Sequence, residues 1–186
     1  VRGVAHPYLE KLAETTGETA LLGVCDGSDV FYVDKVLPDS ELRMDVPLGV
    51  SRPYHCTAVG KAILAHAGLG GLETLAGKEE LEAYTDNTIT DWDDLARELE
   101  EIRQQGYALD RAEFKDGARC VAGVVRNYDD EPIAAVAIAG PAERVRANLE
   151  TIIKEVLATT QQVSIQLGYR GEISASQSEA ARVSVQ

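Results

Sequence analysis

The strongest constraint on the fold is a pair of strand-like runs separated by a tight turn. Residues 20–25 and 30–37 are rich in aliphatic and aromatic side chains, and Asp26-Gly27 lies between them. An Asp-Gly pair in this position predicts a β-hairpin, because glycine readily adopts the positive φ that hairpin turns need. Residues 41–47 follow Pro38-Asp39 and predict a third strand. We therefore expect an antiparallel sheet.

The second half of the chain also contains strand-like runs joined by short turns. Residues 107–110, 119–126 and 132–139 are predicted strands, and residues 127–131 form the turn between the last two. Strands joined by such short turns are antiparallel neighbours. The sequence thus predicts about six strands, most of them connected as hairpins.

Two helices are predicted in the first part of the chain. Residues 5–16 place Leu9 and Leu12 on one face and are followed by Gly17, a common helix stop. Residues 57–66 form a second, strongly apolar helical segment.

Two more helices follow. Thr90 is the predicted N-cap of one, with Asp93 three residues later, and Gly106 ends it. The last helix is predicted to start at Gly140-Pro141, with proline at its first position, and to end at Gly168. Helices packed on an antiparallel sheet make an α+β fold.

Composition narrows the class of protein. The 186 residues suit a single domain, and the net charge of −13 with no basic stripe argues against direct binding of nucleic acid. The acidity fits either a high-salt cytoplasm or an ordinary acidic domain. We see no apolar run long enough for a membrane span and no export leader at Val1, so we expect a cytoplasmic protein without membrane contact. Three widely spaced cysteines also fit a reducing compartment.

The stretch YHCTAVGKAILA, residues 54–65, raises the main question about function. Gly60-Lys61 is similar to part of a phosphate-binding loop, but the required earlier glycine and the following Ser or Thr are missing. Thr57 is a plausible N-cap, which leaves the amides of the next residues without helical partners. Such a helix start can bind a carboxylate. The alternative is a buried helix start at which Gly60 only admits a neighbouring segment.

His55, Cys56 and Cys120 raise the possibility of a metal or a thiol nucleophile. Adjacent residues rarely ligate one metal, and no further ligands stand at the usual spacing, so we expect no metal and no cofactor. Cysteine as a small buried apolar residue is the default interpretation. The stretch from Asp110 to Cys120 is either a solvated loop or a loop that covers a pocket.

Together these residues resemble a known family. The runs GVSRPYHCTAVGKAILA, TDNTITDWDDLARELEEIRQQGYALDRAEFKDGARCVAGVV and AAVAIAGP are similar to the C-terminal effector-binding domain of IclR-family transcriptional regulators. The resemblance covers about residues 9–168, and its Thr-Ala-x-Gly-Lys-Ala core is specific.

The resemblance implies a GAF-like (profilin-like) α+β fold that senses small organic or aromatic acids and is not an enzyme. It implies that residues 1–168 form the effector-binding domain, with residues 1–16 as the end of a linker and the first helix. Residues 169–186 are expected to be a flexible tail. Such domains form dimers or tetramers, and they contact DNA only through an N-terminal winged helix-turn-helix that nothing in this chain matches.

The resemblance also implies the ligand-binding residues. The effector's carboxylate would lie on the amides of Ala58 and Val59 beside Thr57. The other positions implied by the family are Met44 as an apolar wall, Asp110 and Cys120 as polar positions, Ala118 on the covering loop, and Ala137 and Ala139 on the last strand.

The last two positions depart from part of the family. Members that sense the smallest keto acids have serines where this chain has Ala137 and Ala139. We therefore predict a less polar effector than glyoxylate or pyruvate, since each lost hydroxyl removes about 1 kcal/mol of hydrogen bonding. We also expect Val59→Asp to repel an anion without disturbing the fold.

Two other interpretations compete. One is an enzyme on the same scaffold that uses Cys120 or His55 as nucleophile or base. The other is an oligomerisation module with a vestigial pocket, which would bind no metabolite.

Overall fold

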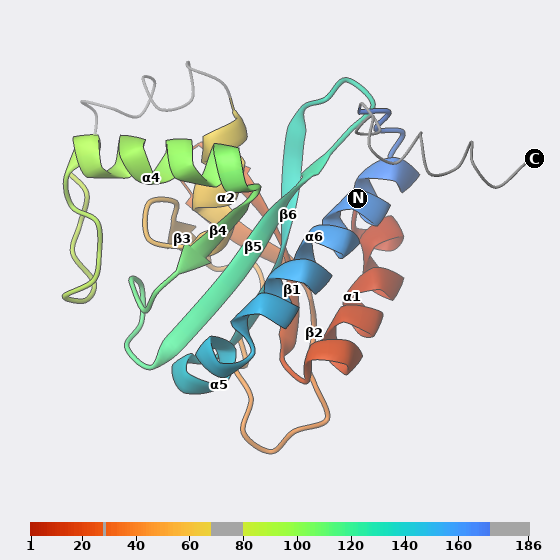
Figure 1. Cartoon of the computed structure of the whole chain (residues 1–186), viewed down its shortest axis with the longest axis horizontal. Helices are drawn as coiled ribbons and strands as arrows, with labels where there is room; N and C mark the ends of the chain where they lie inside the picture. Colours follow the sequence, from red (N-terminus) through yellow and green to blue (C-terminus); the bar gives the residue numbers. More distant parts are fainter. Residues whose placement is uncertain (28, 68–79, 172–186) are drawn as a thin grey trace, which may run out of the picture.

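The computed structural model describes residues 1–27, 29–67 and 80–171. Within these residues, one antiparallel sheet has the strand order β3-β2-β1-β6-β5-β4 (Figure 1). Its strands are β1 (Thr19–Asp26), β2 (Asp29–Val36), β3 (Ser51–Pro53), β4 (Tyr107–Asp110), β5 (Ala118–Arg126) and β6 (Pro132–Pro141). The predicted antiparallel α+β architecture is confirmed.

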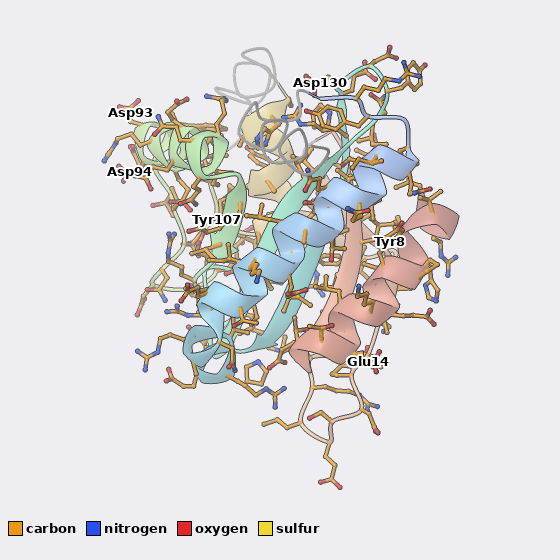
Figure 2. The ribbon with its side chains drawn as sticks, turned by 45° about the vertical axis from the view of Figure 1, so that its right-hand side comes forward. Tyr8, Glu14, Asp93, Asp94, Tyr107 and Asp130 are labelled. Carbon is orange, nitrogen blue, oxygen red and sulfur yellow. The ribbon has the colours of Figure 1, made fainter. Side chains whose placement is uncertain are left out.

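The helices lie on both faces of this sheet, so that the molecule has three layers. They are α1 (Arg2–Thr16), α2 (Ala58–His66), α4 (Trp92–Gln105), α5 (Ala142–Ala147) and α6 (Leu149–Gln166). Figure 2 shows α1, marked by Tyr8 and Glu14, beside α6, whereas Asp93 and Asp94 mark the start of α4 away from this pair. We refer to the two sides of the sheet as the α1/α6 face and the α2/α4 face.

Strand β6 shows how one strand serves two cores. Val136 and Ile138 pack under α1 and α6, while Ala135, Ala137 and Ala139 pack under α2 and α4. All five are fully buried. Alternate side chains of a strand point to opposite faces, so a continuous apolar run is what a doubly covered strand requires. No helix within the described residues is long and apolar enough to cross a membrane.

The predicted strand at residues 41–47 is wrong. This segment is irregular, and β3 forms later. The Met44 carbonyl accepts a hydrogen bond from Thr19 Oγ1 at 2.5 Å, and the Val46 carbonyl accepts one from Lys35 Nζ at 3.0 Å. Hydrogen bonds from two side chains therefore hold this irregular segment in place, although its alternating sequence is typical of a strand.

Two predicted helix starts also need correction. The N-cap of α4 is Asp91 and not Thr90, because Asp91 Oδ1 accepts hydrogen bonds from the amides of Asp93 and Asp94 at 2.9 and 3.0 Å. Pro141 precedes its helix as the N-cap of α5. The predicted ends at Gly17 and Gly106 are confirmed, and both glycines have a positive φ.

The long helix predicted at the C-terminal end is in fact two helices. The side-chain amide of Asn148 donates to the Arg144 carbonyl at 3.0 Å, and its backbone leaves the helical conformation. An asparagine side chain that competes for a backbone carbonyl favours such a break. The predicted tail at residues 169–186 lies outside the described residues from position 172 onward.

Candidate functional site

The start of α2 is built around Thr57. Its Oγ1 accepts a hydrogen bond from the Gly60 amide at 3.2 Å and donates one to the Pro53 carbonyl at 3.0 Å. The Lys61 amide donates to the Thr57 carbonyl at 3.0 Å. Thr57 is therefore the N-cap that the sequence predicts, and it also fixes the segment between β3 and α2.

Gly60 is explained by packing. A Cβ at this position would lie 2.3 Å from the carbonyl oxygen and 2.4 Å from the Cα of Tyr54, both backbone atoms that cannot move aside easily. The glycine therefore lets the preceding segment cross the first turn of α2, as the alternative interpretation of the sequence held. No ligand is needed to account for it.

A cavity of about 150 Å³ opens beside Thr57. It lies between the α2/α4 face of the sheet, the irregular segment after β2 and the loop between β4 and β5. Its lining comprises Leu21, Tyr32, Met44, Asp45, Val46, Pro47, Arg52, Thr57, Asp110, Phe114, Lys115, Ala118, Cys120 and Ala139. The structure thus brings six of the predicted positions together around one space.

The other three predicted positions lie apart from this lining. Ala58, Val59 and Ala137 are buried at 0–1% exposure in the same core. The Val59 side chain packs so closely on the backbone of β1 that a Cβ on Gly23 would lie 2.6 Å from one of its methyl carbons. The expectation that Val59→Asp spares the fold is therefore wrong, because the new carboxylate would be buried in an apolar core.

Asp110 supplies a buried carboxyl group to the cavity. It is 6% exposed, and its Oδ1 accepts a hydrogen bond from the Glu113 amide at 2.7 Å. Burial raises the pKa of Asp110 to about 7, and the negative charge of Glu113 acts in the same direction. The hydrogen bond from Glu113 and the charge of Lys61 only partly oppose this rise. The group can therefore donate or accept a proton near neutral pH.

A buried ion cluster supports the loop that carries Asp110. Lys61 is 0% exposed, and its Nζ lies 2.8 Å from both carboxylate oxygens of Glu113 and 3.0 Å from Oε1 of Glu98. The side chain of Arg111 reaches Glu98 at 3.1 Å, and the Arg111 amide donates to Glu113 at 3.1 Å. Although burial opposes it, the charges of Lys61 and Arg111 hold the pKa of Glu98 below its usual value. The cluster joins α2, α4 and the loop after β4.

Sequence reasoning missed this cluster. From the sequence, Lys61 suggests only a phosphate-binding residue. Its partner Glu113 lies 52 positions away along the chain, so no local pattern links the two. The one available signal was a lysine in the middle of an otherwise apolar helix, since a buried lysine requires a buried acid.

A second hollow, of about 240 Å³, lies beyond β3 and is lined in part by Ser51, Pro53 and His55. The Nε2 of His55 lies 3.0 Å from the Glu82 carbonyl oxygen. His55 therefore lines one space and Cys120 lines the other, and the structure does not bring them together as a nucleophile and its base.

The thiols also lack the chemistry of a nucleophile. Burial, with Asp110 and Glu113 nearby, raises the pKa of Cys120 well above its usual value. Burial likewise raises the pKa of Cys56 and lowers that of His55. A reactive thiolate needs the opposite shift. In the described part of the chain, no three His, Cys, Asp or Glu side chains form a group that could hold a metal.

Comparison with known proteins identifies the family. The family model "Bacterial transcriptional regulator IclR C-terminal" matches residues 1–165. Transcriptional regulator BhcR of Paracoccus denitrificans is 34% identical over 167 residues, which are 89% of this chain and 60% of that protein. Transcriptional repressor IclR of Escherichia coli is 35% identical over 144 residues, or 76% of this chain and 53% of that protein. The chain thus spans little more than half the length of these curated relatives, which are regulators and not enzymes.

Solved structures agree. The IclR protein of Thermotoga maritima superposes with a TM-score of 0.85 at 35% identity, covering 90% of this chain and 68% of that one. A double mutant of the inducer-binding domain of PobR from Acinetobacter, in complex with 3-hydroxybenzoic acid, gives a TM-score of 0.80 at 26% identity, with 88% of this chain and 97% of that one covered. These matches confirm the GAF-like fold. With the family model matching residues 1–165, the chain belongs to the IclR family and forms its C-terminal, effector-binding domain.

Proposed function

We propose that this domain senses a small acid that carries a carboxylate and an apolar body. The observation that carries the proposal is the cavity beside Thr57, in which six of the positions implied by the family surround one space of about 150 Å³. A cavity of about this volume accommodates a benzene-sized molecule, so the effector is small. The wall formed by Leu21, Met44 and Ala139 suits a hydrocarbon body.

In this proposal, the carboxylate lies beside Thr57, the residue at the start of α2 that lines the cavity, where the helix dipole favours an anion. The Gly60 amide is already bonded to Thr57, so the amides of Ala58 and Val59 are the candidate donors, although these two residues do not line the cavity. Asp110 and Cys120 contact the far end of the ligand. Ala118 also lines the cavity, but it is the first residue of β5 and not part of the covering loop as the resemblance implied. Ala137 and Ala139 leave the floor without hydroxyl groups, which favours an acid less polar than glyoxylate or pyruvate. The binding of 3-hydroxybenzoic acid by the related domain of PobR supports an acid of this size.

The wider role is also a proposal. Residues 1–168 would act as the sensing part of a cytoplasmic, DNA-binding transcriptional regulator that assembles as a homodimer or homotetramer. DNA would be contacted through a winged helix-turn-helix domain outside this sequence. The acidity of the chain, with a net charge of −13, supports a division of labour in which this part does not bind DNA itself.

That the ligand in this cavity is an anion can be tested at Ala118, which is 5% exposed and lines the cavity. Ala118→Asp and Ala118→Asn add side chains of equal size, but only the first adds a negative charge. We expect the Asp variant to bind benzoate or hexanoate at least about tenfold more weakly than the Asn variant, because like charges repel strongly away from water. Equal affinities of the two variants would contradict the proposal.

The chemical class can be tested by thermal stabilisation of the unmodified chain. A ligand present at 100 times its dissociation constant adds about 2.7 kcal/mol to the free energy of unfolding. We expect benzoate or hexanoate to stabilise the domain more than glyoxylate does. Stabilisation by glyoxylate alone would contradict an apolar effector, and no stabilisation by any acid would favour the oligomerisation module.

A further inference from the structure

Arg52 is a positively charged side chain of the cavity that the sequence analysis did not single out. It is the middle residue of β3, and it is half-buried. Its neighbours Ser51 and Pro53 line the hollow on the other side of the strand, whereas Arg52 lines the cavity beside Thr57. This division follows from the alternation of side chains along a strand.

The guanidinium group of Arg52 is held in place but not neutralised. Its central carbon lies 4.8 Å from the ring centroid of Phe114, so one face of the group packs on the aromatic ring. Stacking occupies the face of a guanidinium and leaves the N–H groups along its edge available for a planar, bidentate partner. Among the described residues, no carboxylate forms an ion pair with Arg52.

Neither of the acids that line the cavity forms an ion pair with Arg52. Asp45 pairs with Lys35, and Asp110 accepts a hydrogen bond from the Glu113 amide. The remaining charges in the lining are Arg52 and the exposed Lys115, both positive. Among the described residues, neither Arg52 nor Lys115 forms an ion pair, although the chain has 31 acidic and only 18 basic residues.

Two separate features of one cavity therefore favour negative charge. One is the start of α2 at Thr57, and the other is Arg52. We propose that Arg52 binds a second acidic group of the effector, so that the effector is a small dicarboxylic acid. Its hydrocarbon middle lies along Leu21, Met44 and Ala139, and this middle is the part that is less polar than glyoxylate or pyruvate. This inference rests on the proposed function, which places the first carboxylate at Thr57.

Arg52 is the specificity-determining residue in this arrangement, and Lys115 is not. Lys115 is exposed, so water and salt screen its charge, and its flexible ammonium has no fixed geometry. Arg52 is half-buried and oriented by Phe114, which makes a charge-assisted bidentate bond both stronger and more selective. We expect Lys115→Gln to change the affinity for a diacid by less than about threefold.

The experiment uses calorimetry on the 186-residue protein to measure its affinity for acids in matched pairs. In each pair, the monoacid and the diacid have the same number of carbon atoms. The pairs are butyrate and succinate, pentanoate and glutarate, and hexanoate and adipate. At one chain length, we expect the diacid to bind at least about tenfold more tightly than its monoacid, as a hydrogen bond to a charged group would give. In Arg52→Gln this advantage should disappear, so that the diacid binds no more tightly than its monoacid.

Two further variants complete the test. Arg52→Lys keeps the charge but loses the planar pair of N–H groups that a bidentate bond needs, so it should retain only part of the preference for the diacid. Arg97→Gln removes the same charge from the exposed surface of α4 and should leave the advantage unchanged. If Arg52→Gln does not fold, the unmodified chain and Arg52→Lys still decide the question.

The outcomes separate this inference from the proposed function. If monoacids bind and every diacid binds no better, the inference is overturned and the proposed function stands. The same holds if Arg52→Gln keeps the full preference for the diacid. If no acid of the panel binds to the unmodified chain, both the inference and the proposed function fail.

Discussion

The two faces of the sheet handle buried charge in different ways. On the α1/α6 face, the buried carboxylates of Glu18 and Asp34 pair with Arg144 and His6, whose side chains are 34% and 45% exposed. On the α2/α4 face, Lys61 and Glu113 are 0% and 3% exposed. Within the described part of the chain, only this face has an ion pair with both partners away from water.

This difference indicates on which face of the sheet the helices and loops are fixed in position by buried charge. A fully buried ion pair brings little net stability, because the cost of removing two charges from water offsets their attraction. It does, however, fix the relative positions of the groups that it joins. Here it joins α2, whose N-cap Thr57 lines the cavity, to the loop after β4, which forms one wall of the cavity. The α1/α6 face has no such demand and is filled mainly by apolar side chains.

The largest effect is expected from Lys61→Met. The substitution keeps most of the volume but leaves Glu113 buried without its cation, and breaking such a pair costs about 3–5 kcal/mol. Urea denaturation of the variant measures the loss. The double variant Lys61→Met with Glu113→Gln should recover part of it, because no charge is then left unpaired. A loss below about 1 kcal/mol in the single variant would mean that water reaches the pair.

A smaller effect is expected from Leu9→Ala on the opposite face. Leu9 belongs to α1 and is fully buried in the core of the α1/α6 face, and its truncation should cost about 3 kcal/mol through lost burial and the cavity left behind. Because this position lies across the sheet from the ligand cavity, the affinity for benzoate or hexanoate should stay unchanged. Calorimetry under conditions in which the variant remains folded checks this. Weakened binding would show that the two faces are not independent.

The smallest effect is expected in the pH dependence of Asp110. The pKa of this group is about 7 in the folded protein and near 3.8 when unfolded, so the folded state holds an extra proton between these values. The free energy of unfolding should therefore fall as the pH rises from about 4 to 7. Asp110→Asn should remove this fall. The free energy of unfolding of the variant, measured relative to that of the unmodified chain, should therefore be about 2 kcal/mol higher at pH 8 than at pH 5. Parallel urea curves at the two pH values measure it, and equal pH slopes for both proteins would contradict the shift.

The sequence predicts the fold well wherever local signals act. Turns at Asp26-Gly27 and 127–131, and helix ends at Gly17 and Gly106, depend on the conformations of single residues. The segment at residues 41–47 was predicted wrongly because its alternating pattern is that of a strand, whereas its partners are the side chains of Thr19 and Lys35. Contacts of that kind leave no local pattern.

The site shows the same limit. The resemblance led to six residues that do line one cavity, but it did not lead to Arg52, which reaches that cavity through the alternation of a three-residue strand. It also left the specific motif at Gly60-Lys61 unexplained. The structure accounts for both residues, because Gly60 leaves room for the Tyr54 backbone and Lys61 pairs with Glu113. Each reason depends on a tertiary contact.

The alternation of β6 has a mechanical consequence. Ala139 touches the ligand space, while the residue before it, Ile138, packs in the layer beneath α1 and α6. The sheet is therefore a partition only one residue thick between the cavity and the outer helix pair. Because β6 is paired with β1 on one side and with β5 on the other, its backbone is held in place, and the packing of one layer can change without disturbing the other.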